Sequence, residues 1–226
     1  MYLNSMLKKL TMIAIISFTA HTNAGLLTLE TYSSGTATPN TLGGYAMTDF
    51  GIHNTILGGA ASTINSPISG TVSFENMSGA ALNMNLGLAN STGWWQNPES
   101  TDNDIFTTST HWVKILLPEN TRAFSFNVGA SFNGTGWLEA YNGSTKELDR
   151  QTFNVNPNNT PGFGIYASNT NGSCSAITSV IVEPVSWGMG NFSINQSACT
   201  ANVPEPGTIS LLGLGLLGLV VIRRRI

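Results

Sequence analysis

The chain has 226 residues, only 9% of them charged, and a formal net charge of −3 at neutral pH. Five of its nine Lys and Arg residues lie near the two ends, so residues 25–206 carry four cations against twelve acids, a formal charge of −8. A surface this acidic repels phosphate backbones, which argues against nucleic acid as a partner. The 182 residues of this segment are enough for one domain with its own core.

The first 24 residues have the layout of a secretory signal peptide. Lys8 and Lys9 form a basic start, residues 10–20 are apolar, and Thr22 and Ala24 are small residues at the positions that a signal peptidase reads. This layout predicts cleavage after Ala24 and export of the remaining chain. The alternative, a buried amphipathic helix, is disfavoured because the apolar block has no helical polar periodicity.

Alternation of apolar and polar residues dominates the exported part of the chain. Leu82, Met84, Leu86 and Leu88 interleave with polar or small residues, as a strand with one buried face requires. Residues 25–66 are less regular and predict loops and edge strands. Asn-Gly pairs at 133–134, 142–143 and 171–172 predict tight turns, and the first two are placed to close hairpins. Further strands are predicted at residues 71–74, 112–117, 124–128, 137–141, 152–155, 163–167, 177–183 and 192–194.

Many short strands separated by polar turns predict an all-β fold, because each one-sided sheet must bury its apolar face against another. We expect a single antiparallel β-sandwich, jelly-roll-like, over residues 25–202. An N-terminal signal helix and a short C-terminal transmembrane helix would flank it. Trp112, Trp137 and Trp187 are expected to pack in its core.

The only two cysteines, Cys174 and Cys199, are predicted to form a disulfide, because an exported pair meets an oxidising compartment. The alternative is two separately buried thiols.

The last 24 residues combine a short motif, an apolar run and a basic end. Val203, Pro204, Glu205 and Pro206 precede an uncharged stretch, and Arg223, Arg224 and Arg225 follow it. Residues 208–222 would span about 22 Å as a helix, which is less than the roughly 30 Å of a hydrocarbon core. The arginines hold their end on the cytoplasmic side. The run therefore predicts a marginal, temporary membrane anchor.

Residues 203–226 resemble the PEP-CTERM sorting signal of exopolysaccharide-producing Gram-negative bacteria. The resemblance implies recognition by an exosortase, a membrane-embedded transpeptidase that cuts near the Pro-Glu-Pro and releases or transfers the protein, much as other hydrophobic tail signals are removed. The stretches LPENTRAFSFNVGASFNGTGWLEAYNG, TPGFGIYASN and GNFSINQSAC also resemble the body domain of a PEP-CTERM group. That second resemblance covers residues 112–199 and implies a β-sandwich without a known activity.

Residues suited to catalysis are scarce. Removal of the signal peptide leaves only His53 and His111, and no G-x-S-x-G, H-E-x-x-H or P-loop is present. We therefore expect no enzyme, no catalytic residue and no cofactor, with a secreted hydrolase as a remaining alternative. Glu99, Asp102 and Asp104 crowd three carboxylates into one loop, which is either a solvated turn or a calcium site.

Trp94 and Trp95 are the predicted sugar contact. Consecutive residues in a strand point to opposite faces, so one of the two indoles is exposed, and a flat aromatic face packs well against a sugar ring. The sequence as a whole predicts a non-catalytic protein of the cell surface or of an exopolysaccharide biofilm matrix. Its predicted partners are the exosortase and exopolysaccharide. A carbohydrate-binding module, aided by calcium, is the alternative.

Overall fold

A computed structural model describes residues 27–34, 36, 38–51, 59–88, 104–108, 112–168, 175–183 and 187–198. All regular secondary structure in these ranges is β-strand, and every strand pair is antiparallel. The predicted signal helix and C-terminal transmembrane helix lie outside the described residues. Within the described residues, no helix is long and apolar enough to cross a membrane.

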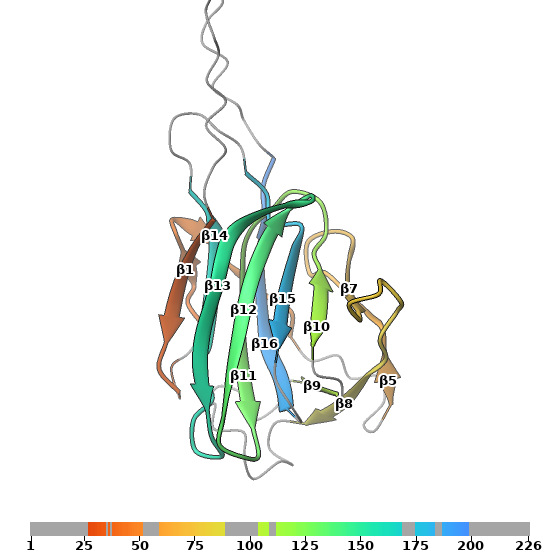
Figure 1. The fold of residues 1–226 in the computed structure, drawn as a ribbon. Coiled ribbons are helices and arrows are strands. Elements are labelled where there is room, and N and C mark those ends of the chain that lie inside the picture. Colours follow the sequence, from red (N-terminus) through yellow and green to blue (C-terminus); the bar gives the residue numbers. More distant parts are fainter. Residues whose placement is uncertain are drawn as a thin grey trace, which may run out of the picture.

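The strands form two large sheets and a small hairpin (Figure 1). The eight-stranded sheet contains, in spatial order, β1 (Leu27–Tyr32), β14 (Gly162–Ala167), β11 (Thr121–Ala130), β16 (Trp187–Gln196), β9 (Asp104–Thr108), β8 (Met84–Leu88) and β5 (Ala60–Ala61), with β4 (Thr48–Asp49) also paired to β16. The six-stranded sheet contains β13 (Thr145–Val155), β12 (Gly134–Asn142), β15 (Ser179–Glu183), β10 (Val113–Leu116), β7 (Thr71–Glu75) and β6 (Thr63–Asn65). The hairpin consists of β2 (Thr41–Leu42) and β3 (Tyr45–Ala46).

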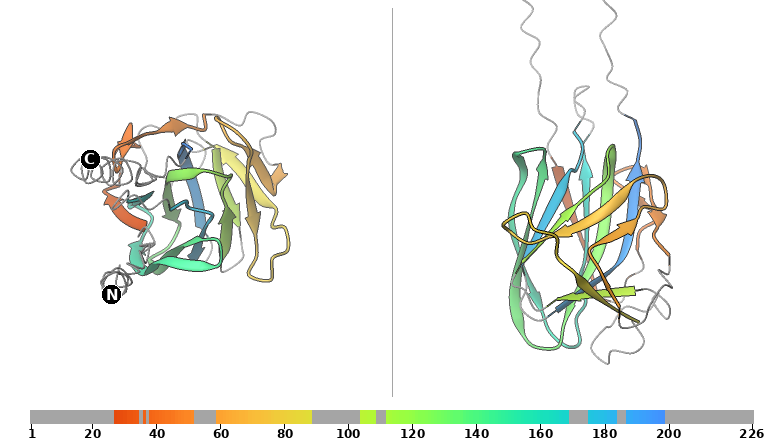
Figure 2. Two further views of the ribbon diagram at one scale, coloured as in Figure 1. Left: turned by 90° about the horizontal axis from the view of Figure 1, so that it is seen from above. Right: turned by 90° about the vertical axis from the view of Figure 1, so that its right-hand side faces the viewer.

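The two sheets face each other as the layers of a β-sandwich, which confirms the predicted class (Figure 2). The consecutive strands β9 to β16 supply four neighbouring positions in each sheet, β14-β11-β16-β9 in one and β13-β12-β15-β10 in the other. A chain that crosses repeatedly between two facing four-stranded sheets in this strand order forms a jelly roll. The remaining strands extend the edges of the sheets.

Aromatic rings fill the space between the layers. Phe106 and Phe192 stack with ring centroids 5.3 Å apart, and Phe124 lies 5.5 Å from Phe192. Phe74, from the opposite sheet, lies 5.4 Å from Phe106. Apolar residues at alternate positions of both sheets complete this core, because successive side chains of a strand point to opposite faces.

Residues 38–51, here called the N-terminal strap, cross the outer side of the eight-stranded sheet with the β2–β3 hairpin and then join that sheet as β4 (Figure 2). The backbone amide of Phe50 donates to the Phe192 carbonyl at 3.0 Å, and the Tyr45 hydroxyl donates to the Ala167 carbonyl at 3.0 Å. Leu42 is fully buried. All ten residues of β11 are consequently buried, on both faces of the strand.

The predicted strands are present, with changes at their ends. Residues 152–155 are only the last part of β13, and residues 177–178 precede β15. The Asn142-Gly143 turn does close the hairpin between β12 and β13. The hairpin predicted at Asn133-Gly134 is wrong, because β11 and β12 belong to different sheets and this segment carries the chain from one to the other. Tight-turn chemistry specifies a reversal of direction but not the sheet in which the next strand pairs.

Candidate functional site

The outer face of the six-stranded sheet presents aromatic and charged side chains. Leu138, Ala140, Val180 and Val182 point inward and are fully buried, so the residues between them point outward. The same phase continues in β10, where Ile115 is fully buried and Lys114 is partly exposed. Every second residue of four neighbouring strands therefore projects from this face.

The pairing register arranges these outward side chains in three rows across the strands. Trp112, which immediately precedes β10, comes opposite Glu183 when the register of β10 and β15 is extended by one residue. The first row then contains Trp112, Glu183 and Trp137; the second contains Glu75, Lys114, Ile181 and Glu139; the third contains Ser73, Leu116, Ser179 and Tyr141.

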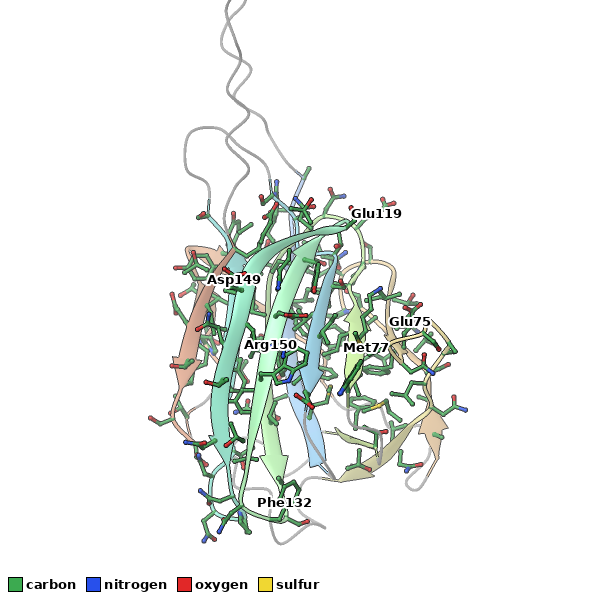
Figure 3. The ribbon with its side chains drawn as sticks, in the orientation of Figure 1. Glu75, Met77, Glu119, Phe132, Asp149 and Arg150 are labelled. Atoms are coloured by element: carbon green, nitrogen blue, oxygen red, sulfur yellow. The ribbon has the colours of Figure 1, made fainter. Side chains whose placement is uncertain are left out.

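Arg150 occupies the centre of this outer face (Figure 3). Its guanidinium carbon lies 3.5 Å from the centroid of the Trp137 ring, and its Nε lies 3.7 Å from Glu139 Oε2. Lys146 Nζ approaches the same carboxylate oxygen at 3.5 Å, and the Tyr141 hydroxyl donates to Glu139 Oε1 at 2.8 Å. The Glu139 side chain is only 7% exposed. A carboxylate this buried requires such partners, because an unpaired buried charge is strongly destabilising.

The charges of this face are paired at more than one place. Lys114 Nζ lies 3.7 Å from Glu75 Oε2, directly across the strand pair. Burial, followed by the hydrogen bond to Glu139, raises the pKa of Tyr141 to about 12. The phenol therefore stays protonated at neutral pH and continues to donate to Glu139. On the opposite sheet, burial and neighbouring Glu30 raise the pKa of Tyr32.

Most of the site residues predicted from sequence lie outside the described residues. This holds for the tryptophan pair, Ala24, both cysteines and the sorting motif, and for Glu99 and Asp102 of the carboxylate loop. Asp104 begins β9, but its side chain is also outside the described part. Among the described residues, no group of three His, Cys, Asp or Glu side chains could hold a metal ion.

The segments that flank the two cysteines converge on one turn. The backbone amide of Ile177 donates to the Thr121 carbonyl at 2.9 Å, and that of Ser197 donates to the Asn120 carbonyl at 3.1 Å. Ile177 is three residues from Cys174, and Ser197 is two residues from Cys199. Adjacent residues of the Asn120 turn thus hold both flanking segments, and the pairing of the two cysteines stays a prediction.

The expectation that Trp112 and Trp137 pack in the core is wrong. Trp112 is 38% exposed, and Trp137 lies on the outer face beneath Arg150. Trp187 begins β16, and its side chain lies outside the described residues. The period-two pattern contained the signal for the first two: Trp112 is in phase with Lys114, and Trp137 is in phase with Glu139. A charged residue two positions away indicates the outward face of a strand.

Comparison with known proteins identifies the C-terminal segment. Residues 202–225 match the PEP-CTERM protein-sorting motif, so the chain is a β-sandwich protein that ends in a signal for exosortase sorting. No curated protein matches the chain. A solved structure of TmCBM61 in complex with β-1,4-galactotriose is 12% identical, with a TM-score of 0.26, over 56% of this chain and 87% of that one. That score is too low to transfer a fold or a ligand to this chain.

Proposed function

We propose that this protein is exported by a Gram-negative bacterium, sorted by an exosortase, and then acts as a non-catalytic component of the cell surface or exopolysaccharide matrix. The sorting motif at residues 202–225 carries the proposal. It follows a β-sandwich directly, so the tail serves delivery while the sandwich performs the work at the destination.

The non-catalytic assignment rests on the chemistry of the chain. Only two histidines remain after residue 24, and general acid–base or nucleophilic catalysis depends most often on a positioned histidine. The charged cluster around Glu139 is engaged in internal ion pairs. The Glu139 carboxylate is therefore occupied by internal partners and is not poised as a general acid or base.

Intact-mass measurement of the protein recovered from the cell envelope and from the medium tests the sorting step. We expect the wild-type mass to end near Pro206 and the Glu205→Ala variant to retain Arg223 to Arg225. Glu119→Ala is the matched control, since Glu119 is an exposed acid on the sandwich and its loss should leave processing unchanged. Processing of Glu205→Ala identical to that of wild type would contradict the proposal.

The alternative functions predict different results. A carbohydrate-binding module that uses Trp94 or Trp95, with calcium at the neighbouring carboxylates, would lose glycan binding in Trp94→Ala or Trp95→Ala and after chelation. A secreted hydrolase would turn over a member of a polysaccharide or ester panel. Neither turnover nor a loss of glycan binding on substitution of Trp94 or Trp95 is expected from the proposed function.

A further inference from the structure

The two outer faces of the sandwich differ in how the described chain covers them. On the eight-stranded sheet, the outward-pointing Ser125 and Ser193 are only 1% and 2% exposed, and Leu42 of the N-terminal strap is fully buried. On the six-stranded sheet, the outward Ser179 and Ile181 are also buried, at 4% and 6% exposed, but Trp112, Lys146 and Arg150 around them are 38%, 42% and 54% exposed. The described residues thus leave these longer side chains of the six-stranded sheet accessible to a partner.

Exposed apolar surface gathers at one end of this face. The exposed large hydrophobic residues of the described chain are Ile68, Met77 and Trp112. Two of these belong together: Met77 follows β7 by two residues and Trp112 precedes β10, and these strands are neighbours. Figure 3 shows Met77 and Arg150 on the same face. Trp112 and Met77 therefore offer an apolar platform at the edge of the first row.

Polar groups continue the same row. Glu183 lies between Trp112 and Trp137 in the register, and Arg150 covers Trp137. Since neighbouring strands are about 4.8 Å apart, the backbones of Trp112 and Trp137 are separated by roughly 10 Å, which is about the length of a disaccharide unit. The row is a strip with an indole at one end, an acceptor in the middle and a guanidinium donor at the other end.

Arg150 is held in place before any ligand arrives. Its guanidinium is stacked on Trp137 and paired with the buried Glu139 carboxylate, although 54% of the side chain remains exposed. Arginine is suited to this role because its planar fork stacks on an aromatic ring while keeping donors at its edge. A pre-positioned donor loses little conformational entropy when it binds a hydroxyl group.

The charge balance of the face selects the kind of occupant. Three carboxylates, those of Glu75, Glu139 and Glu183, are matched there by Lys114, Lys146 and Arg150. Asp149, an exposed acid next to Arg150 on β13, adds a further carboxylate (Figure 3), so the face has no excess of positive charge. Among the described residues Glu183 has no ion pair, so it would repel the carboxylates of an acidic sugar.

A second protein is a poor fit to the same surface. Stable protein interfaces have an apolar centre from which charges are depleted, whereas the centre here is occupied by Arg150, Glu139 and Lys146. The hydroxyl groups of a sugar, by contrast, hydrogen-bond well to charged side chains. Its C–H faces pack against an indole.

We infer that the strip formed by Met77, Trp112, Glu183 and Arg150 binds an extended, uncharged polysaccharide, with Trp112 stacking on a sugar ring and Glu183 and Arg150 bonding its hydroxyl groups. The inference rests on the proposed delivery to the cell surface, where such polymers occur. It places the sugar site on the sheet face rather than at Trp94 and Trp95.

Affinity electrophoresis and calorimetry of the processed, full exported protein test this inference. The probes are galactan, mannan and a soluble β-glucan as uncharged polymers, and alginate as an anionic one. We expect binding to at least one uncharged polymer and none to alginate. Trp112→Ala should weaken that binding by about tenfold or more, as loss of a central aromatic contact does, and Glu183→Gln should weaken it as well. Ile68→Ala removes an apolar side chain of similar exposure outside the strip and should leave binding unchanged.

Several outcomes would overturn the inference. These are no binding to any uncharged polymer, preference for alginate, equal binding by wild type and Trp112→Ala, or loss of binding only in Trp94→Ala or Trp95→Ala. Self-association in solution that Trp112→Ala abolishes would show that the strip binds a second copy instead. Intact mass separates this test from that of sorting, because Trp112→Ala should be processed normally whether or not the strip binds sugar.

Discussion

Replacing Gly43 with alanine should destabilise the sandwich by about 2–5 kcal/mol, whereas the same change at the neighbouring Gly44 should cost about 1–2 kcal/mol. The two glycines form the turn between β2 and β3, with φ angles of 58° and 86°. Positive φ at both positions is typical of a tight hairpin turn. An L-residue in this conformation loses about 1–2 kcal/mol, and both variants share that cost.

The difference between the variants comes from Tyr166. A Cβ on Gly43 would overlap the ring of Tyr166, while a Cβ on Gly44 would have no atom within 4 Å. Tyr166 belongs to β14, so the overlap lies where the N-terminal strap crosses the eight-stranded sheet. Forcing extra volume into a packed contact adds about 1–3 kcal/mol.

Urea unfolding followed by tryptophan fluorescence measures both variants against wild type, with equal slopes required for the comparison. Repeating the pair in a Tyr166→Ala background should make the two alanine variants equally stable, because the obstructing ring is gone. Equal losses in the wild-type background would refute the close contact between the strap and β14 and the role assigned to the strap.

Three further predictions concern the core, the charged face and the cysteines. Phe192→Ala should cost about 3–5 kcal/mol in urea unfolding, because its ring contacts those of Phe106 and Phe124 between the sheets; a loss below 1 kcal/mol would contradict its central position. The free energy of unfolding should fall as the pH rises from about 10, where tyrosine ionises in the unfolded chain, to about 12, the raised pKa of Tyr141 in the folded protein. Unfolding midpoints measured across this pH range should decline less in the Tyr141→Phe variant than in wild type. Free-thiol labelling of the exported protein should find no reactive cysteine, and Cys174→Ser, Cys199→Ser and the double variant should each lose about 3 kcal/mol; additive losses would argue for two independent thiols.

Local patterns predicted the strands well because the alternation of apolar and polar residues depends only on residues that are close together in the sequence. Phe124, Phe126 and Val128 alternate with polar residues, and the sequence accordingly predicts a strand there, as found in β11. The same pattern also suggests that Ser125 and Asn127 face water, yet both are buried. The strap that covers this sheet lies more than 70 residues earlier in the chain, so no local pattern could reveal its position.

The sugar strip shows the same division between local and long-range information. The phase of Trp112 with Lys114 was readable in the sequence and argued for an outward indole. The sequence did not predict that Trp112, Glu183 and Arg150 share one face. Trp112 precedes β10, Glu183 ends β15 and Arg150 lies in β13, and only the spatial order of the six-stranded sheet brings these strands onto one face.

By itself the sequence determined the all-β class, the acidic character and the sorting motif at residues 202–225. Each of these depends on composition or on residues close together in the chain. Only the tertiary structure decided which outer face is covered and which side chains share the open one. Strand pairing joins segments tens of residues apart, and the period-two pattern assigns each residue to one of two faces without saying what lies over that face.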